Sequence, residues 1–598
     1  MLAVAVSREL ERFPTRNYPY RIADGAAASP PEVEPATPAR PNVLFRRVLG
    51  IDPAARPMTA DELLGLDDPF GHLLRSGKPF PLTLRELLVA VDDLGGTRQA
   101  LPDQLVFLAA DGGHIPWTPE TDRLRRSFRF VVARGRGEFN LLVSSSTALD
   151  SPVDNAFLQV AGWDATHQVF HYYERRQGTY FWAGMSHHAL EDATRGRGPF
   201  DSHVNGSLVM KELRSPWMHW HAPLAGINEE ALAPDDPLRN DPLFRKRATA
   251  ERLEIEVVRP AIRRWNEARV RGALDAGGAW RYPRHFLRQA LTDTAVNLAS
   301  SETASHLLTD ATPVRPPLSF FLNRDTLFDT LALEPQDVGV ADIAVPGSLY
   351  RRCLQRYDVH RSDGAIRIEG DSLFAFLTPE PAYEDTQLVD TMVREGLLSP
   401  RFVACLSMVD FTNPVFSERR AALVSYAPPD GSGIRSGDEL EARFVATVGK
   451  AVASDEHGAG RADSPEREFL ANWQIADHKR VFIGRITDYF KALRSGMVDA
   501  DVVDGWFRLA EYRRRCFRKR PLAEFALSTP RTNIPLSAPA LRMTLQGRAE
   551  PIIQSTSGHS PPAIEPKRRI VVQRLDPPGH LDDFTEAEKD AWSRTVSG

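Results

Sequence analysis

Residues 215–223, with the sequence SPWMHWHAP, place two histidines and two tryptophans between two prolines. Imidazole binds transition metals and carries protons near neutral pH, and large aromatic side chains exclude water. The stretch lies at the end of a longer segment, residues 167–221, which we call the histidine window. It holds seven of the chain's 16 histidines: His167, His171, His187, His188, His203, His219 and His221. This concentration predicts a site for a metal ion or a haem.

The primary metal-ligand candidates are His203, His219 and His221. If residues 215–223 are extended, His219 and His221 project to the same side, so both imidazoles can bind one ion. His203 would supply a third nitrogen and leave one coordination position open for water, oxygen or substrate. That arrangement suits catalysis better than a closed structural site.

A helical alternative stays open, because Ser215-Pro216 is also a good helix start. On a helix His219 and His221 would point about 200° apart, so only one could be a ligand. The remaining histidine could then bind a haem iron, with Trp217 or Trp220 packing on the macrocycle.

Further candidates come from the segment before this stretch. His171 and His188 are expected to substitute as ligands or to transfer protons, and Trp182, with Trp217 and Trp220, to shield reactive intermediates from water. His167 and His171 are expected on one face of a strand. Carboxylates that could complete a set of two histidines and one carboxylate are Asp164, Glu191, Asp192, Asp201 and Glu212.

A competing interpretation is that the window is a packed core. Histidine and tryptophan often line domain junctions, where backbone carbonyls satisfy their polar atoms. A further alternative is a non-catalytic ligand-binding or assembly protein, in which the aromatic window recognises a ligand or a partner.

Several common site motifs are absent from the sequence. It contains no GxSxG, no P-loop, no complete GxGxxG and no HExxH, so no nucleotide cofactor is expected. Cys353, Cys405 and Cys516 lie far apart and form no CxxC, which disfavours a disulfide framework and covalent haem. The basic run 513–520 is interpreted as a solvated helix face.

The spacing of apolar residues predicts the main elements. Alternation predicts a strand pair over 127–135 and 138–146, and a three-strand meander over 156–164, 167–175 and 179–186. Helical spacing predicts helices over 202–213, 249–274 with a kink at Pro260, 283–300, 464–496 and 499–520.

These elements predict an α+β fold, with an antiparallel β-meander in the N-terminal half followed by a mainly α-helical C-terminal half. Four segments are expected: a flexible 1–42, a mixed α/β region over 43–320 that carries the histidine window, a mainly helical region over 321–527 packed on it, and a Pro-rich tail over 528–598.

The formal net charge of -5 indicates no polyanion partner. The N-terminal sequence does not resemble a signal peptide, and no apolar run approaches the roughly 18 residues of a membrane span. We therefore expect a cytoplasmic protein with a small-molecule substrate and with neither nucleic acid nor membrane as a partner. Self-association into a homo-oligomer is left open.

Together these features favour a metal- or haem-dependent oxidoreductase that acts on a small organic substrate. Iron is favoured over copper or zinc, and non-covalent haem is the alternative cofactor. A zinc-dependent hydrolase would use the same histidine cluster.

Overall fold

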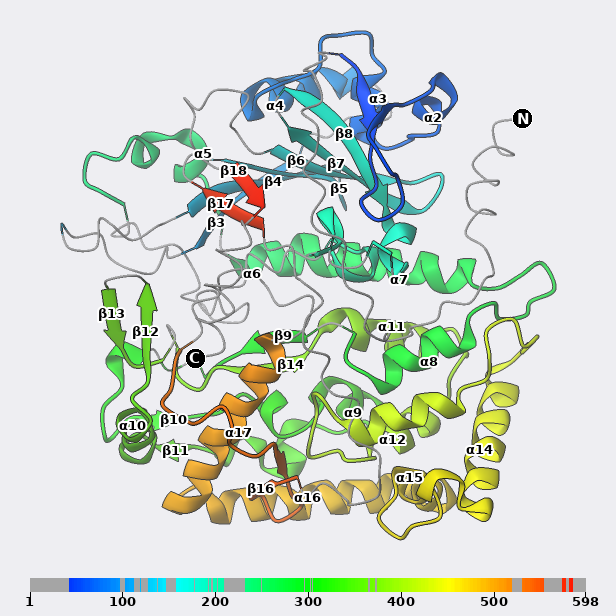
Figure 1. Cartoon of the computed structure of the whole chain (residues 1–598), viewed down its shortest axis with the longest axis vertical. Helices are drawn as coiled ribbons and strands as arrows, with labels where there is room; N and C mark the ends of the chain where they lie inside the picture. Colours follow the sequence, from blue (N-terminus) through cyan, green and yellow to red (C-terminus); the bar gives the residue numbers. More distant parts are fainter. Residues whose placement is uncertain are drawn as a thin grey trace. The chain divides into compact units, whose positions relative to one another are not determined.

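The computed structural model describes residues 42–96, 103–111, 119, 127–136, 138–146, 158–176, 178–191, 193–194, 197–201, 203–208, 232–248, 250–294, 296–301, 303, 305–363, 366–371, 374–518, 530–552, 573–576 and 580–583. These residues form two compact units (Figure 1). Unit 1 contains the described residues up to Ala268 and those between 573 and 583. Unit 2 contains those from Arg269 to 518 and 530–552. The four-segment organisation stays a prediction.

Unit 1 is built on an eight-stranded sheet with the order β2-β1-β8-β7-β6-β5-β4-β3. All neighbours are antiparallel except β1 and β8, which are parallel, so the sheet is mixed. The strands are β1 (Leu44–Arg46), β2 (Arg56–Pro57), β3 (Asp103–Asp111), β4 (Ser127–Arg136), β5 (Glu138–Ser146), β6 (Leu158–Asp164), β7 (Val169–Arg176) and β8 (Thr179–Met185). The predicted strand pair and meander are β4 to β8.

The meander β6-β7-β8 is almost completely buried, including the residues on both faces of β7 and β8. Helix α3 (Pro69–Leu74) packs on β5 and β6, and the turn 186–190 packs on β7 and β8. The register of β7 on β8 shifts between Tyr172 and Tyr173. A strand covered on both faces must carry apolar or hydrogen-bonded side chains throughout, so His171, the one histidine of β7, needs partners.

The remaining elements of unit 1 are short. They are α2 (Ala60–Leu64), α4 (Leu84–Asp92), α5 (Pro242–Arg245), α6 (Ala250–Leu253) and the strand pair β17 (Gln573–Asp576) and β18 (His580–Asp583). Helix α7 (Arg259–Gly272) crosses the division between the units.

One of the two helices predicted after the meander needs correction. The predicted helix over 202–213 is wrong in its described part, where residues 204–206 form a single tight turn. Asn205 has a left-handed φ of 58° and Ser207 is extended, neither of which continues a helix. The helix predicted over 249–274 is present as α6 and α7, and a π-turn at Glu254–Val258 joins them just before Pro260, whose missing N–H cannot continue the α-helical ladder.

Unit 2 is mainly helical. Its helices are α8 (Pro283–Leu291), α9 (Arg324–Leu331), α10 (Gly347–Arg356), α11 (Tyr383–Arg394), α12 (Pro400–Ser407), α13 (Glu418–Ala422), α14 (Gly437–Ser454), α15 (Pro465–Gln474), α16 (His478–Gly496) and α17 (Ala500–Arg518). The strand pairs are β9 (Val296–Ala299) with β14 (Thr378–Pro381), β10 (Pro313–Val314) with β11 (Val345–Pro346), β12 (His360–Asp363) with β13 (Ile366–Glu369), and β15 (Leu541–Met543) with β16 (Ala549–Pro551). The N-terminal sheet and this helical half confirm the predicted α+β fold.

Two predicted helices of unit 2 are broken. The segment 283–300 is helical only to Leu291, because Thr292 is extended and the backbone N–H of Thr294 is held by the Asp385 carboxylate, 2.9 Å away. The segment 464–496 is two helices, since Asp477 caps a new start after Gln474.

The basic run at the end of α17 is not a solvated face throughout. Arg513 and Arg514 are 2% and 1% exposed. Arg513 donates to the carbonyl oxygen of Phe320, and Arg514 pairs with Glu511. The carbonyl oxygen of Phe320 and the carboxylate of Glu511 therefore bind these two guanidinium groups in the interior. No helix among the described residues has the length and apolar character needed to cross a membrane.

Candidate functional site

Four of the predicted site residues lie outside the described residues: Trp217, Trp220, His219 and His221. The other four, His171, Trp182, His188 and His203, are buried in unit 1.

His203 does not meet His171. Its ring stacks on Tyr172 with the centroids 4.9 Å apart. Tyr172 follows His171 on β7, and successive side chains of a strand point to opposite faces of the sheet. The sheet therefore separates His203 from His171.

Trp182 links His171 and His188. Its ring centroid lies 6.0 Å from that of His171 and 5.5 Å from that of His188. Nδ1 of His188 accepts the backbone N–H of Met185 at 3.0 Å. Burial, followed by the charge of Arg46, lowers the pKa of His188 to about 3, so this imidazole is neutral at pH 7.

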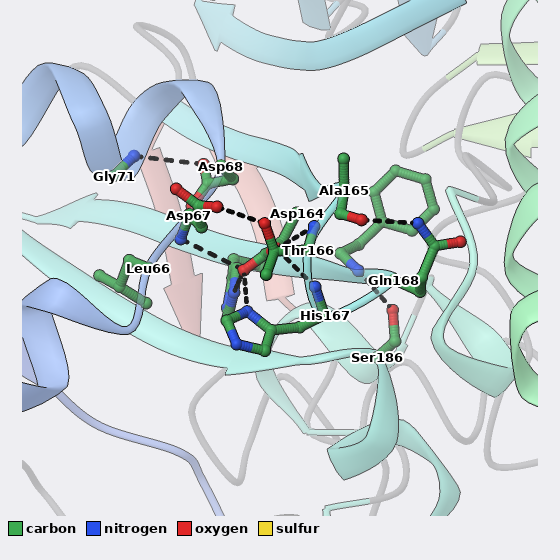
Figure 2. Close-up of polar contacts among 12 residues, drawn as sticks. Leu66, Asp67, Asp68, Gly71, Asp164, Ala165, Thr166, His167, Gln168 and Ser186 are labelled. Carbon is green, nitrogen blue, oxygen red and sulfur yellow. Dashed lines mark hydrogen bonds and ion pairs between the residues drawn. The ribbon is translucent and has the colours of Figure 1, made fainter. Parts of the chain in front are cut away.

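A polar cluster of unit 1 surrounds Asp164, at the turn between β6 and β7 (Figure 2). Its side chain is fully buried. Oδ2 lies 2.7 Å from Nδ1 of His167 and 3.2 Å from Nε2 of His171. Oδ1 accepts the backbone N–H groups of Thr166 and His167 at 2.9 and 2.8 Å. One carboxylate thus closes the turn and holds two imidazoles.

Both ring nitrogens of His171 are committed to hydrogen bonds. The indole N–H of Trp182 donates to Nδ1 at 3.1 Å, and indole is a donor only. Nδ1 therefore carries the lone pair, and Nε2 carries the proton that is donated to Asp164. His171 cannot bind a metal without breaking one of these bonds.

His167 is held differently. Nδ1 donates to Asp164, while Nε2 has no hydrogen-bond partner among the described residues, and the side chain is 21% exposed. The hydrogen bond to Asp164 raises the pKa of His167, against the opposing effect of partial burial. Burial alone would raise the pKa of Asp164, but the hydrogen bonds from His167 and His171 outweigh it and leave that pKa well below its usual range.

The segment before α3 supports this cluster. The backbone N–H of Asp67 donates to Oδ2 of Asp164 at 3.2 Å. The Asp67 carboxylate accepts the hydroxyl of Thr166 (Figure 2). It also pairs with Nε2 of His72 at 2.7 Å. The segment is thereby fixed on the β6-β7 turn.

Asp68 ties the same segment to the sheet. It caps α3 through the N–H groups of Phe70 and Gly71 and accepts the hydroxyl of Tyr173 on β7. Complete burial raises the pKa of Asp68. This approach requires Gly162, because a Cβ there would lie 2.0 Å from Oδ1 of Asp68.

Sequence reasoning placed His167 and His171 together and counted Asp164 among nearby carboxylates, but it missed Asp67, Asp68 and His72. Asp67 is 97 residues from Asp164 along the chain. The only local signal was the Asp68-Pro69 helix start.

Within the described part of the chain, no group of three or more His, Cys, Asp or Glu side chains is placed to hold a metal ion. At the Asp164 cluster the hydrogen bonds explain why no such group forms. Both ring nitrogens of His171 and one ring nitrogen of His167 are already hydrogen-bonded. What the cluster can do chemically is transfer a proton through Nε2 of His167, with Asp164 orienting the ring and stabilising its protonated form.

Comparisons with known proteins found no matching family model, no matching curated protein and no matching solved structure.

Proposed function

We propose that the chain is an enzyme in which His167 transfers protons to and from a small organic substrate bound at the β6-β7 turn. The observation that carries the proposal is the hydrogen bond of 2.7 Å from Nδ1 of His167 to Asp164, on a side chain that is 21% exposed and whose Nε2 has no partner among the described residues. A carboxylate on one ring nitrogen fixes the tautomer and leaves the other nitrogen for chemistry.

The contrast with His171 favours catalysis over packing. The same carboxylate binds both rings, but His171 is buried and paired at both nitrogens, as expected of a structural histidine. His167 is partly exposed and paired at one nitrogen only. The hydrogen bond to Asp164 raises the pKa of His167, which favours the imidazolium form that can donate a proton.

Turnover tests this proposal. The full-length chain is incubated with pools of small esters, amides, lactones and hydroxy acids, and consumption is followed by NMR. For any compound consumed, His167→Gln should lower kcat at least about 100-fold, the usual contribution of a positioned acid or base. The exposed His457→Gln serves as control. Unchanged turnover in His167→Gln would remove this residue from the chemistry.

We also keep metal- or haem-dependent oxidation of a small organic substrate as a second proposal, favoured by the two histidines and two tryptophans within residues 215–223. Its ligands would be His203, His219 and His221, with iron preferred over zinc or copper. With zinc in that position the chemistry would be hydrolysis.

Metal content tests the second proposal. Elemental analysis of the purified chain should give about one metal ion per chain, or an absorption spectrum with a Soret band if haem is bound. His219→Ala and His221→Ala should each release most of that metal or haem, because a lost ligand weakens a site strongly. Metal content that is the same in both variants would exclude these residues.

A further inference from the structure

Asp67, in the segment before α3, is a second carboxylate at the candidate site (Figure 2). Its side chain is 38% exposed, whereas that of Asp164 is fully buried. The backbone N–H of Asp67 donates to the same oxygen of Asp164 that accepts the His167 ring. Its carboxylate accepts the hydroxyl of Thr166, the residue before His167. A partly exposed negative charge therefore lies close to the ring that we propose transfers protons.

The second partner of the Asp67 carboxylate, His72, is a neutral imidazole. Arg75 donates from Nη2 to Nδ1 of His72 at 3.0 Å, and arginine is a donor only. Nδ1 therefore carries the lone pair, and Nε2 carries the proton that is donated to Asp67 at 2.7 Å. Since the Thr166 hydroxyl is also a neutral donor, neither partner neutralises the charge of Asp67.

The guanidinium group of Arg75 is bound to other acceptors. Its Nε and Nη2 donate to the carbonyl oxygens of Gly71 and Leu66 at 3.3 and 2.8 Å. The His72 ring lies between Arg75 and Asp67, bound to the first through Nδ1 and to the second through Nε2. Among the described residues no ion pair joins Arg75 to Asp67, so the negative charge of Asp67 is left at the edge of the site.

This charge acts on the ring of His167. The pKa of His167 is raised first by its hydrogen bond to Asp164, against partial burial, and then by the charges of Asp164 and Asp67. Charges closer together than the Debye length, about 8 Å in physiological salt, are only partly screened. The same field acts on a charged group of any molecule that approaches Nε2.

We propose that Asp67 sets the charge specificity of the His167 site, so that neutral and cationic substrates are accepted and anionic ones are disfavoured. A substrate anion at Nε2 of His167 would be repelled by Asp67 as well as by Asp164. Uncharged esters, amides and lactones should therefore be accepted in preference to hydroxy acids, which are anions at pH 7. This inference rests on the proposed function, because it concerns the substrate of the same site.

Alkylation of His167 by reagents of different charge tests the proposal without a substrate. The full-length chain is treated with neutral bromoacetamide or anionic bromoacetate, and modification of the peptide that contains His167 is followed by mass spectrometry. In both reactions the unprotonated Nε2 displaces bromide and forms an N–C bond, so the fraction of unprotonated ring cancels in the ratio of the two rates.

The ratio of the bromoacetamide rate to the bromoacetate rate should be at least about threefold larger for His167 than for N-acetylhistidine, because only the anion is repelled. In about 1 M salt the ratio should fall toward that of N-acetylhistidine, since the Debye length shrinks to about 3 Å. A ratio equal to that of N-acetylhistidine in low salt would contradict the proposal.

Asp67→Asn removes the charge and keeps both hydrogen bonds, since its oxygen can accept the N–H of His72 and its amide can donate to the Thr166 hydroxyl. The rate ratio should fall at least about twofold in this variant. Asp235→Asn, at an exposed position of the same unit, is the matched control and should leave the ratio unchanged. Equal ratios in wild type and Asp67→Asn, or no alkylation of His167 by either reagent, would overturn the proposal.

This result is distinguishable from a failure of the proposed function. Alkylation measures charge and access at Nε2 of His167, whereas turnover in His167→Gln measures catalysis. A charge preference that depends on Asp67 would therefore stand even if His167→Gln kept full turnover.

Discussion

Asp164→Ala should destabilise unit 1 by about 3–5 kcal/mol, the usual cost of removing one partner from a buried ion pair. The variant leaves two imidazoles and the backbone N–H groups of Asp67, Thr166 and His167 without their common acceptor. Each buried unsatisfied group costs about 1–3 kcal/mol, so the effect is large even if water replaces part of the carboxylate.

Hydrogen exchange followed by mass spectrometry measures this effect locally. Amides of residues 158–176 should exchange much faster in Asp164→Ala, because the turn that joins β6 to β7 loses its cap. Asp235→Ala, at an exposed position of the same unit, should change stability by no more than about 0.5 kcal/mol. Equal protection of residues 158–176 in Asp164→Ala and wild type would show that this carboxylate does not organise the turn.

Gly162→Ala should cost about 3 kcal/mol, near the upper end of the usual cost of overpacking. The new Cβ would lie 2.0 Å from Oδ1 and 2.7 Å from Cγ of Asp68, which caps α3 and holds Tyr173. Asp68 cannot move away without losing these bonds. Chemical denaturation of the two proteins measures the difference.

Two further variants separate the clash from a general effect of replacing glycine. Gly449→Ala lies within α14 with no atom near the new Cβ, and it should be neutral or stabilising by up to about 1 kcal/mol. Combining Gly162→Ala with Asp68→Ser, which shortens the side chain but keeps a helix cap, should recover part of the loss. A cost below about 0.5 kcal/mol for Gly162→Ala alone would contradict the packing described here.

The sequence predicted the strand pair and the meander well, because each of the strands β4 to β8 is long enough to show alternation of side chains between the two faces of the sheet. It missed β1, which has three residues and pairs with β8 in parallel and with β2 in antiparallel register. It also predicted a helix over 202–213, where Gly206 and the left-handed Asn205 instead form a tight turn. Apolar spacing alone does not detect such local backbone geometry.

The candidate site was predictable only in part, because a sequence pattern detects contacts between residues that are close along the chain. His167 and His171 are close in sequence, so their shared environment follows from one hairpin. The contribution of Asp67 and His72 depends on how the segment before α3 packs on that hairpin, about 100 residues away, and no local pattern carries that information. The pairing of His171 with Trp182, which removes it as a ligand, also depends on cross-strand contact between β7 and β8.

The most direct test of the central claim is an NMR titration of the His167 imidazole in wild type and in Asp164→Asn. The account predicts a pKa above the ordinary value of about 6.5 in wild type and a lower one in the variant, because the charge that stabilises the imidazolium is removed. Correspondingly, the stabilisation from the pair is complete below about pH 6.5, down to the range where Asp164 itself becomes protonated, and is lost as the pH rises through the raised pKa. A His167 pKa at or below 6.5 in wild type, or one that Asp164→Asn does not change, would contradict the account.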